Sequence, residues 1–236
     1  MEAKYKRILL KLSGEALMGK DEFGINPSAI MQFAKEVSEI HVLGVEIAIV
    51  VGGGNIFRGI QASSKGITKS SGDHMGMLAT VINAIAFRNT LENIGVDARV
   101  QTATFMPQFA ELFSENKAKK HLEKGRVVIF AGGTGNPFFT TDSAAALRSI
   151  EIEAEILIKA TDVDGIYDSD PKKNPNAKLY KKISYHEVLE KQLRVMDLTA
   201  ITLCQENSCK IAILNLNKQG NLTKFICGEN IGSLVL

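Results

Sequence analysis

The sequence lacks the features by which several classes of protein are recognised. No apolar run in its 236 residues approaches the length of a membrane span, and the basic start at Lys4, Lys6 and Arg7 leads directly into a strand-like pattern rather than a signal peptide. The charges nearly balance, with 28 basic and 26 acidic residues and no long basic block, which argues against nucleic-acid binding as the main function. We therefore expect neither a membrane nor a nucleic acid as the partner.

Metal sites and the common phosphate-binding motifs are missing as well. The cysteines Cys204, Cys209 and Cys227 lack the spacing of zinc ligands, so we expect reduced, buried thiols in a cytoplasmic protein. The acidic stretch 162–170 superficially suggests calcium, but Lys173 stands where an EF-hand requires glutamate, and we predict no metal site there. No G-x-x-x-x-G-K-[ST] run, G-x-G-x-x-G run or protein-kinase signature occurs, which disfavours P-loop enzymes and Rossmann dehydrogenases.

The sequence does contain two glycine-rich stretches, each of which follows a strand-like apolar run. Residues 130–142 read Phe-Ala-Gly-Gly-Thr-Gly-Asn-Pro-Phe-Phe-Thr-Thr-Asp and precede an Ala-rich segment typical of a helix, and residues 50–55 read Val-Val-Gly-Gly-Gly-Asn. A strand, a glycine turn and a helix N-terminus can together hold an anion through backbone N–H groups and the helix dipole. One such stretch is also explained by an ordinary strand-to-helix connection with Thr141 or Asp142 as the helix cap. The presence of two favours a pair of phosphate sites.

Two lysines stand where apolar runs end. Lys11 lies near the end of the run 7–12, which Ser13-Gly14 terminates, and Lys159 closes the run 156–158. An unpaired ammonium is costly to bury, so each lysine is either an edge or snorkelling residue or a ligand-binding group at the carboxyl end of a strand. The segment around Lys11 does not by itself decide between these alternatives.

Strand-like and helical patterns alternate along the whole chain. This predicts an α/β fold, a three-layer αβα sandwich with a central, mostly parallel sheet, in a single domain over residues 1–236. A loose division between Lys159 and Thr161 separates a lobe of residues 1–158 from a smaller lobe of residues 159–236. We expect strands at 7–12, 45–51, 98–102, 127–129, 156–158, 211–216 and 233–236, loops at 19–26, 59–72 and 162–171, and helices at 27–43, from Asp73 onward, at 107–125, after Asp142, at 185–193 and at 198–206.

The positions of the four histidines help to indicate what kind of group accepts the phosphate. None of the four lies in an evident nucleophile or metal constellation. A phosphate or carboxylate acceptor is already ionised and needs no general base, so we infer an anionic acceptor. Arg58, just past the triple glycine, is then a candidate clamp, although it is also explained as a solvated loop residue. Asp73 is either a helix cap or an acceptor for sugar hydroxyls, and these roles are compatible.

Several of these motifs, in this order, resemble the bacterial UMP kinases, a group within the amino acid kinase fold family. The resemblance extends over essentially the whole chain, and its most specific part is the segment from Gly135 to Asp142. The matching motifs are Lys11-Leu12-Ser13-Gly14, Gly52-Gly53-Gly54-Asn55, Arg58-Gly59, Gly72-Asp73-His74-Met75, Gly135-Asn136-Pro137-Phe138-Phe139-Thr140-Thr141-Asp142, Lys159-Ala160-Thr161 and Val163-Asp164-Gly165.

The resemblance implies transfer of the γ-phosphoryl group of MgATP to UMP, within pyrimidine nucleotide biosynthesis. Lys11, Asp142 and Lys159 would be catalytic, with Asp142 orienting the lysines. The first lobe would bind UMP and the second ATP. UMP would contact Gly53, Arg58, Asp73, Thr134, Gly135, Asn136, Pro137, Phe138, Phe139, Thr140 and Thr141. ATP would contact Lys11, Leu12, Ser13, Gly14, Gly54, Arg58, Thr161, Tyr167 and Asp170.

Family members are typically homohexamers, and many are activated by GTP and inhibited by UTP. These properties are expected here only through the resemblance, as is a GTP-linked role for residues 19–24. Asp162 stands where relatives often have a basic or amide residue, so the nucleotide contacts of that loop can differ. The alternatives are a carbamate or acetylglutamate kinase on the same fold, and a nucleotide- or oxyanion-binding module without turnover.

Overall fold

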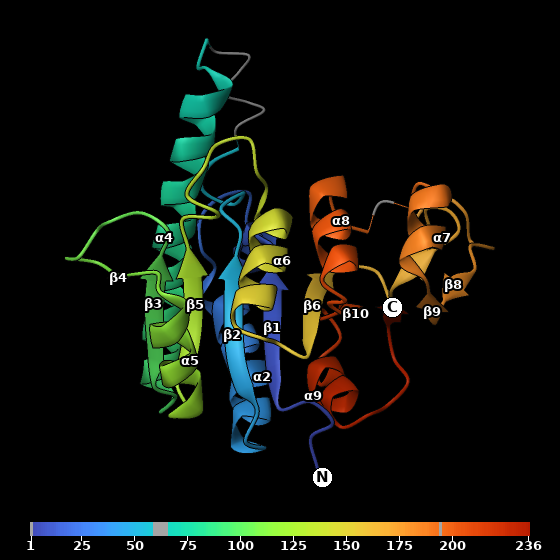
Figure 1. Cartoon of the computed structure of the whole chain (residues 1–236), viewed down its shortest axis with the longest axis horizontal. Coiled ribbons are helices and arrows are strands. Elements are labelled where there is room, and N and C mark those ends of the chain that lie inside the picture. The colour runs from blue at the N-terminus through green and yellow to red at the C-terminus, as the bar shows by residue number, and fades with distance from the viewer. Residues whose placement is uncertain (1, 59–65, 194) are drawn as a thin grey trace.

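The computed structural model describes residues 2–58, 66–193 and 195–236, and it shows the predicted three layers (Figure 1). Among these residues, nine strands form one sheet in the order β4-β3-β5-β2-β1-β6-β10-β11-β9, and β7 pairs with β8. Every neighbouring pair in the large sheet is parallel except β10 with β11. The strands are β1 (Arg7–Leu12), β2 (Glu46–Val51), β3 (Ala98–Thr102), β4 (Glu111–Leu112), β5 (Val127–Ala131), β6 (Ile156–Thr161), β7 (Ile166–Tyr167), β8 (Leu179–Tyr180), β9 (Lys182–Ile183), β10 (Ile211–Asn215) and β11 (Ser233–Val235).

Helices cover both faces of this sheet. One face packs against α1, α2, α4 and α9, and the other against α5, α6, α7 and α8. The described helices are α1 (Gly14–Met18), α2 (Pro27–Val42), α4 (Lys69–Asn93), α5 (Glu115–Glu123), α6 (Thr141–Glu151), α7 (Tyr185–Glu190), α8 (Leu198–Glu206) and α9 (Asn221–Ile226). In the described part of the chain, no helix is long and apolar enough to cross a bilayer.

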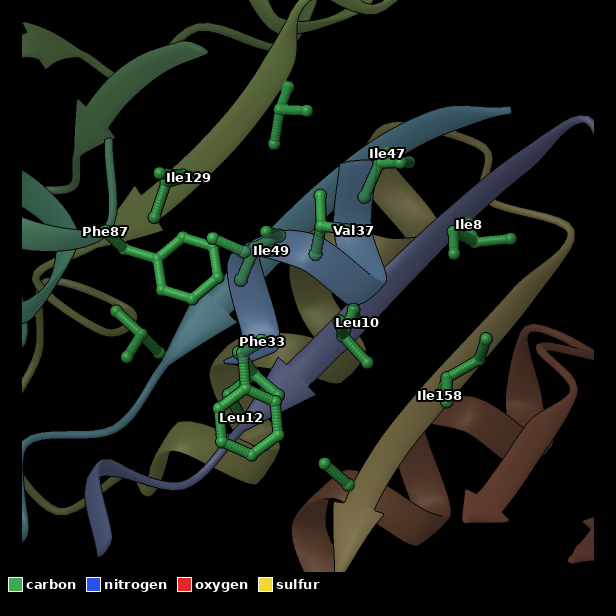
Figure 2. Packing of buried hydrophobic residues seen from close by; sticks show 14 of the residues in the cluster. Ile8, Leu10, Leu12, Phe33, Val37, Ile47, Ile49, Phe87, Ile129 and Ile158 are labelled. Carbon is green, nitrogen blue, oxygen red and sulfur yellow. The ribbon is translucent and has the colours of Figure 1, made fainter. Parts of the chain in front are cut away.

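Alternating side chains of the central strands supply the two cores. In β1, Ile8, Leu10 and Leu12 face α2, where they meet Phe33 and Val37 (Figure 2). Leu9, which lies between them in the sequence, belongs to the opposite core. Both faces of a covered parallel strand must be apolar, which explains why the central strands read as continuous apolar runs.

Helix α2 begins at residue 27 as predicted, and local capping groups define both of its ends. The Asn26 side chain accepts hydrogen bonds from the N–H groups of Ser28 and Ala29, Pro27 begins α2, and Gly44 follows its end with φ of 80°. For α6 the predicted cap is wrong by one residue. The Thr140 hydroxyl, rather than Thr141 or Asp142, accepts the N–H groups of Asp142 and Ser143. Asp142 is thereby placed in the first turn of the helix.

The cap predicted at Asp73 is also wrong. Helix α4 begins at Lys69, where the Thr68 hydroxyl accepts the N–H of Ser71. The predicted loop 59–72 therefore ends earlier than expected, and Gly72 is a buried helical residue; its part at 59–65 lies outside the described residues. Asp73 is free of capping because Thr68 performs that role, and its carboxylate is available for a contact with another segment.

The predicted helix 107–125 is in fact a short strand followed by a shorter helix. Glu111 and Leu112 pair with β3, and α5 starts only at Glu115. Pairing with a neighbouring strand is a non-local interaction that local propensity does not report. For the same reason the sequence did not predict the pairing of β7 with β8 in the region 162–180. The helix α1, directly after Ser13, was also missed.

The sheet continues across the predicted division at Lys159–Thr161, because β6 pairs with β1 on one side and with β10 on the other. The division into two lobes stays a prediction. All three cysteines are free thiols; Cys204 and Cys209 are buried, whereas Cys227 is half-buried.

Candidate active site

Lys11 and Lys159 lie side by side toward the carboxyl ends of two adjacent strands. They are direct partners in the register of the parallel strands β1 and β6. Residues in register on parallel neighbours project from the same face of the sheet, so both ammonium groups point toward the layer that contains α6. Two positive charges are thus brought together at the edge where parallel α/β sheets bind their ligands.

Asp142, in the first turn of α6, lies between the two lysines. Its Oδ1 is 2.8 Å from Lys11 Nζ, and its Oδ2 is 2.7 Å from Lys159 Nζ. Lys159 Nζ also donates a hydrogen bond to the carbonyl of Val195 at 2.7 Å. The cluster carries one net positive charge, since two ammonium groups share one carboxylate. It can hold its lysines in place and still attract an anion.

Burial and charge act in opposite directions on the pKa of Asp142. Burial alone would raise this pKa, but the charges of Lys11 and Lys159 overcome it and hold the pKa below its ordinary value. The pKa of Lys159 is lowered, first by burial and then by repulsion from Lys11, while Asp142 opposes the shift. Asp142 is therefore ionised at neutral pH and serves as an orienting charge rather than as a proton acceptor.

The first glycine turn requires glycine because other segments approach it closely. A Cβ on Gly52 would lie 2.8 Å from Gly14 N, and a Cβ on Gly53 would lie 2.8 Å from Ala79 Cβ in α4. Contacts of that length are not tolerated in folded proteins, so any larger residue would push these segments apart. The turn is packed between α1 and α4.

The second turn requires glycine for its backbone conformation. Gly132, Gly133 and Gly135 have φ of 75°, 60° and 84°, a left-handed conformation that glycine adopts without a steric clash. Phe138 also has φ of 71°, a costly conformation for a residue with a side chain. Its N–H donates to Oδ2 of Asp73 at 2.8 Å, so Asp73 stabilises the strained residue.

The two turns line the same cavity. This cavity has a volume of about 200 Å³ and lies between the turns and α4. Of the residues predicted to bind the acceptor, Gly53, Asp73, Thr134, Asn136, Phe139, Thr140 and Thr141 line it. Gly135, Pro137 and Phe138 belong to the same turn but do not line it, and the Phe138 ring is exposed. Lys69, Met77 and Thr80 line it without having been predicted.

Asp73 remains charged in this cavity. Burial alone would raise its pKa, but Lys69, 2.6 Å away, and the Phe138 N–H hold the pKa below its ordinary value. An ionised carboxylate in a pocket is a strong acceptor for hydroxyl groups.

Residues predicted to bind ATP surround two larger cavities. One, of about 480 Å³, is lined by Ser13, Thr161 and Leu216, and the other, of about 720 Å³, by Lys159, Thr161, Tyr167 and Asp170. Thr161 lines both. Gly54 instead lines the smaller cavity between the glycine turns, and Gly14 begins α1. The Leu12 side chain is fully buried in the core, so this residue can offer a ligand only its backbone.

Arg58 lies between the two groups of residues. Its Nη2 is 2.8 Å from Oε1 of Glu15, and its Nε donates to the carbonyl of Gly54 at 3.2 Å. It lines none of the three cavities described above. The neighbouring Gly59 lies outside the described residues. The half-exposed guanidinium connects the first glycine turn with α1, which leaves its role as a clamp a prediction.

Asp197 is a further residue of this region that the sequence did not reveal. It caps α8 by accepting the N–H of Ala200 at 3.0 Å, and it also accepts hydrogen bonds from the hydroxyls of Thr140 and Ser143 at the start of α6. The signal available in the sequence was its position just before the predicted helix 198–206, which is typical of a cap. Its second set of contacts depends on how α6 and α8 pack.

Comparison with known proteins gives the family. Residues 6–215 match the model of the amino acid kinase family. The chain belongs to this family. Its fold also matches solved family members closely. The UMP kinase from Bacillus anthracis is 37% identical, with a TM-score of 0.96 over 98% of this chain and 96% of that one. The UMP kinase from Ureaplasma parvum is 38% identical, with a TM-score of 0.92 over 98% and 99% of the two chains.

A curated relative extends the match beyond bacteria. The chloroplastic uridylate kinase PUMPKIN of Arabidopsis thaliana is 57% identical over 233 residues, which are 98% of this chain and 69% of the relative. The amino acid kinase fold predicted from the sequence is thereby confirmed.

Proposed function

We propose that this protein is a UMP kinase, which transfers the γ-phosphoryl group of MgATP to UMP and forms UDP and ADP. One observation carries the proposal: both glycine turns open on one cavity at the sheet edge where Lys11, Asp142 and Lys159 gather. The relatives named uridylate kinase or UMP kinase support the choice of acceptor. An enzyme that forms UDP would act in pyrimidine nucleotide synthesis.

The reaction needs charge stabilisation more than proton transfer. A phosphate oxygen of UMP forms the new bond to the γ-phosphorus of ATP, the bond from that phosphorus to the β–γ bridging oxygen breaks, and the electron pair leaves with ADP. The attacking oxygen is already ionised, so no general base is required. Lys11 and Lys159 stabilise the charge on the transferred group, and Asp142 keeps them oriented.

The cavities are compatible with the binding roles that the family suggests. The backbone of the second glycine turn and Thr134–Thr141 would hold UMP, with Asp73 accepting its ribose hydroxyls. Tyr167 and Asp170 would border the adenosine of ATP, with Lys11–Gly14, Gly54 and Thr161 along its phosphates. Arg58 would bridge the two substrates.

Magnesium would enter with ATP rather than occupy a site of its own. In the described part of the chain, no group of three or more His, Cys, Asp or Glu side chains is placed to hold a metal ion. Mg²⁺ is commonly held by substrate phosphates together with one or two carboxylates and water, which suits an ion carried by the nucleotide.

A direct assay tests the function. Purified protein with MgATP is offered UMP, CMP, dUMP, carbamate and acetylglutamate, and ADP formation is followed. We expect UMP to be the preferred acceptor. Preferred phosphorylation of carbamate or acetylglutamate would replace the proposal by one of these kinases. Nucleotide binding without transfer to any acceptor would indicate a binding module.

Assembly, regulation and location complete the proposal. We infer a homohexamer from the family; exposed apolar side chains such as Met75, Leu78 and Ile82 on α4 offer a surface for contacts between subunits, and light scattering would measure the mass of the assembly. Activation by GTP and inhibition by UTP are inferred from the family and are tested by adding each to the assay. Free cysteines suit a reducing compartment such as the cytoplasm, and localisation of the tagged chain tests this.

A further inference from the structure

One face of α4 contacts both glycine turns. Asp73, Gly76, Thr80 and Asn83 follow one another at intervals of three or four residues, which places them in a line along the helix. Asp73 accepts the N–H of Phe138 from the second turn, and the carbonyl of Gly76 lies against Gly53 of the first turn. The helix therefore lies between the two segments that we assign to the substrates.

Thr80 bonds the second turn to this helix. Its Oγ1 accepts the N–H of Gly132 at 2.8 Å and donates its only hydrogen to the carbonyl of Met77 at 2.6 Å. The threonine is buried, and so is its bond to Gly132. A buried N–H that loses its acceptor costs more than an ordinary hydrogen bond contributes, so the position of the turn depends on this hydroxyl.

Asn83, one turn farther along α4, forms hydrogen bonds with the first glycine turn. Its Nδ2 donates to the carbonyl of Gly52 and to Oδ1 of Asn55, both at 2.7 Å. Asn55 donates in return to Oδ1 of Asn83 at 3.0 Å and to the carbonyl of Gly24 at 2.7 Å. Both amides are buried. The pair thus holds the first turn to α4 with a closed set of hydrogen bonds.

We propose that Thr80 and Asn83 are positioning residues, which hold the two glycine turns at a set separation on α4. They thereby determine where the acceptor phosphate lies relative to the Lys11–Asp142–Lys159 cluster. This inference rests on the proposed function, because it concerns the same site. Phosphoryl transfer requires the reacting atoms to be about 3–3.5 Å apart, and a displacement of about 1 Å can cost about 100-fold in rate.

The test compares threonine variants at two positions of the same helix. Thr80→Val removes the hydroxyl, Thr80→Ser keeps it, and Thr90→Val is the control, since the Thr90 hydroxyl donates to the carbonyl of Ala86 within α4 and, among the described residues, makes no bond to either glycine turn. We expect Thr80→Val to lower kcat/KM for UMP by about 10-fold to 100-fold, with the KM for MgATP changed less than about twofold. Thr80→Ser should restore most of the loss, and Thr90→Val should behave as wild type.

A second readout uses the protein without substrates. Amide hydrogen exchange of peptides that cover residues 131–136 should become faster in Thr80→Val and stay unchanged in Thr90→Val. In Asn83→Ala the faster exchange should move to residues 51–56. If Thr80→Val does not fold, Thr80→Ala replaces it, because that change removes the same hydroxyl without adding bulk.

The outcomes separate the positioning role from the proposed function. Wild-type activity with UMP, together with equal effects of Thr80→Val and Thr90→Val, would overturn the positioning role alone. Failure of Thr80→Ser to rescue, or faster exchange spread over the whole molecule, would also overturn it. Local exchange changes in a protein that does not phosphorylate UMP would support positioning and refute the proposed function.

Discussion

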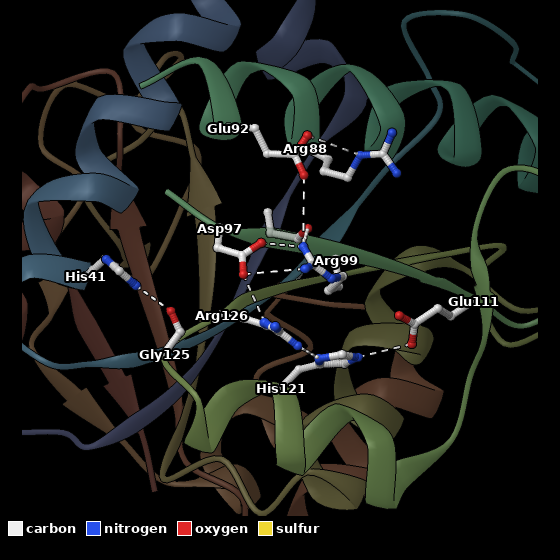
Figure 3. Close-up of polar contacts among 10 residues, drawn as sticks. His41, Arg88, Glu92, Asp97, Arg99, Glu111, His121, Gly125 and Arg126 are labelled. Atoms are coloured by element: carbon white, nitrogen blue, oxygen red, sulfur yellow. Dashed lines mark hydrogen bonds and ion pairs between the residues drawn. The ribbon is translucent and has the colours of Figure 1, made fainter. Parts of the chain in front are cut away.

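Two carboxylates in this protein each lie between two cations, one near the carboxyl ends of the strands and the other near the amino ends. Asp142 lies between Lys11 and Lys159 at the carboxyl edge. Asp97 lies between Arg99 and Arg126, where β3 and β5 begin, next to the contacts of His121 with Arg126 and Glu111 (Figure 3). Local ionic geometry alone does not distinguish the two clusters, although we assign catalysis only to the first.

Burial distinguishes them. The side chains of Lys11, Asp142 and Lys159 are 9%, 13% and 18% exposed, whereas those of Arg99, Asp97 and Arg126 are 31%, 49% and 30% exposed. Water screens the second cluster and weakens its interactions, whereas the first acts in a medium of lower dielectric constant. A buried cluster with a surplus charge is poised to bind an anion, and an exposed network contributes at most modest stability.

The two clusters also differ in the type of cation that they contain. A guanidinium binds a carboxylate through a planar fork and stays with it, whereas an ammonium is a compact charge on a flexible stem. Lys11 and Lys159 can therefore share Asp142 and also turn toward a phosphoryl group. The comparison predicts that equivalent substitutions in the two clusters have unequal effects.

Removal of a cation should produce the largest difference. We expect Lys11→Ala to lower kcat by about 10²–10³-fold, because it deletes a charge that stabilises the transition state, while UMP binding is retained. Steady-state kinetics and calorimetry with UMP measure the two quantities. Arg126→Ala is the matched control, expected within about twofold of wild-type kcat. Equal losses in both variants would end the distinction between the clusters.

Neutralisation of the carboxylates should differ in stability. Asp142→Asn leaves two buried ammonium groups without their counter-ion and should lower the free energy of unfolding by about 3 kcal/mol. Asp97→Asn should cost less than about 1 kcal/mol. Urea denaturation of both variants gives the two values. Inorganic phosphate should raise the Tm of Asp142→Asn more than that of wild type, and the absence of any such rise would argue against an anion site at the lysines.

The pH dependence of kcat/KM for MgATP should reflect the protonation state of Lys159. The pKa of Lys159 in the free protein lies below the ordinary lysine value of 10.5. As the pH rises, Lys159 therefore loses its proton at a lower pH than an ordinary lysine, and the activity falls with it. The rate is therefore full below the lowered pKa and falls above it. In Lys159→Arg, whose guanidinium stays charged, this alkaline fall should disappear although the overall rate is lower. A fall in the wild type that begins only above 10.5 would contradict the lowered pKa.

Salt should produce the smallest effect. Raising the ionic strength from about 0.05 M to about 1 M shortens the screening distance several-fold, which weakens exposed ion pairs much more than buried ones. The small destabilisation by Asp97→Asn should vanish at high salt, whereas most of the effect of Asp142→Asn should persist. Urea denaturation at both salt concentrations measures this, and equal salt sensitivity of the two variants would show that the Asp142 cluster is as well solvated as the surface network.

Many helices and strands could be predicted from the sequence, because the signals that define them lie in short stretches of chain. The predicted helix 27–43 begins where α2 begins, and the predicted strand 98–102 coincides with β3. The short strand at Glu111–Leu112 could not be predicted, because its only reason to form is the pairing with β3. The cap of α4 was misplaced because Asp73 is a good capping residue, but the helix begins earlier, at Lys69 with Thr68 as its cap, and Asp73 lies inside the helix and contacts Phe138 instead.

The sequence by itself determined the fold class and the chemical groups of the site, because apolar periodicity, glycine turns and strand-ending lysines are written in short stretches of chain. The tertiary structure alone decided which of these groups meet. The register of β1 with β6 put Lys11 beside Lys159, the packing of α6 brought Asp142 between them, and α4 joined the two glycine turns. These contacts join residues far apart in the chain, and their energies depend on burial, which no local pattern records.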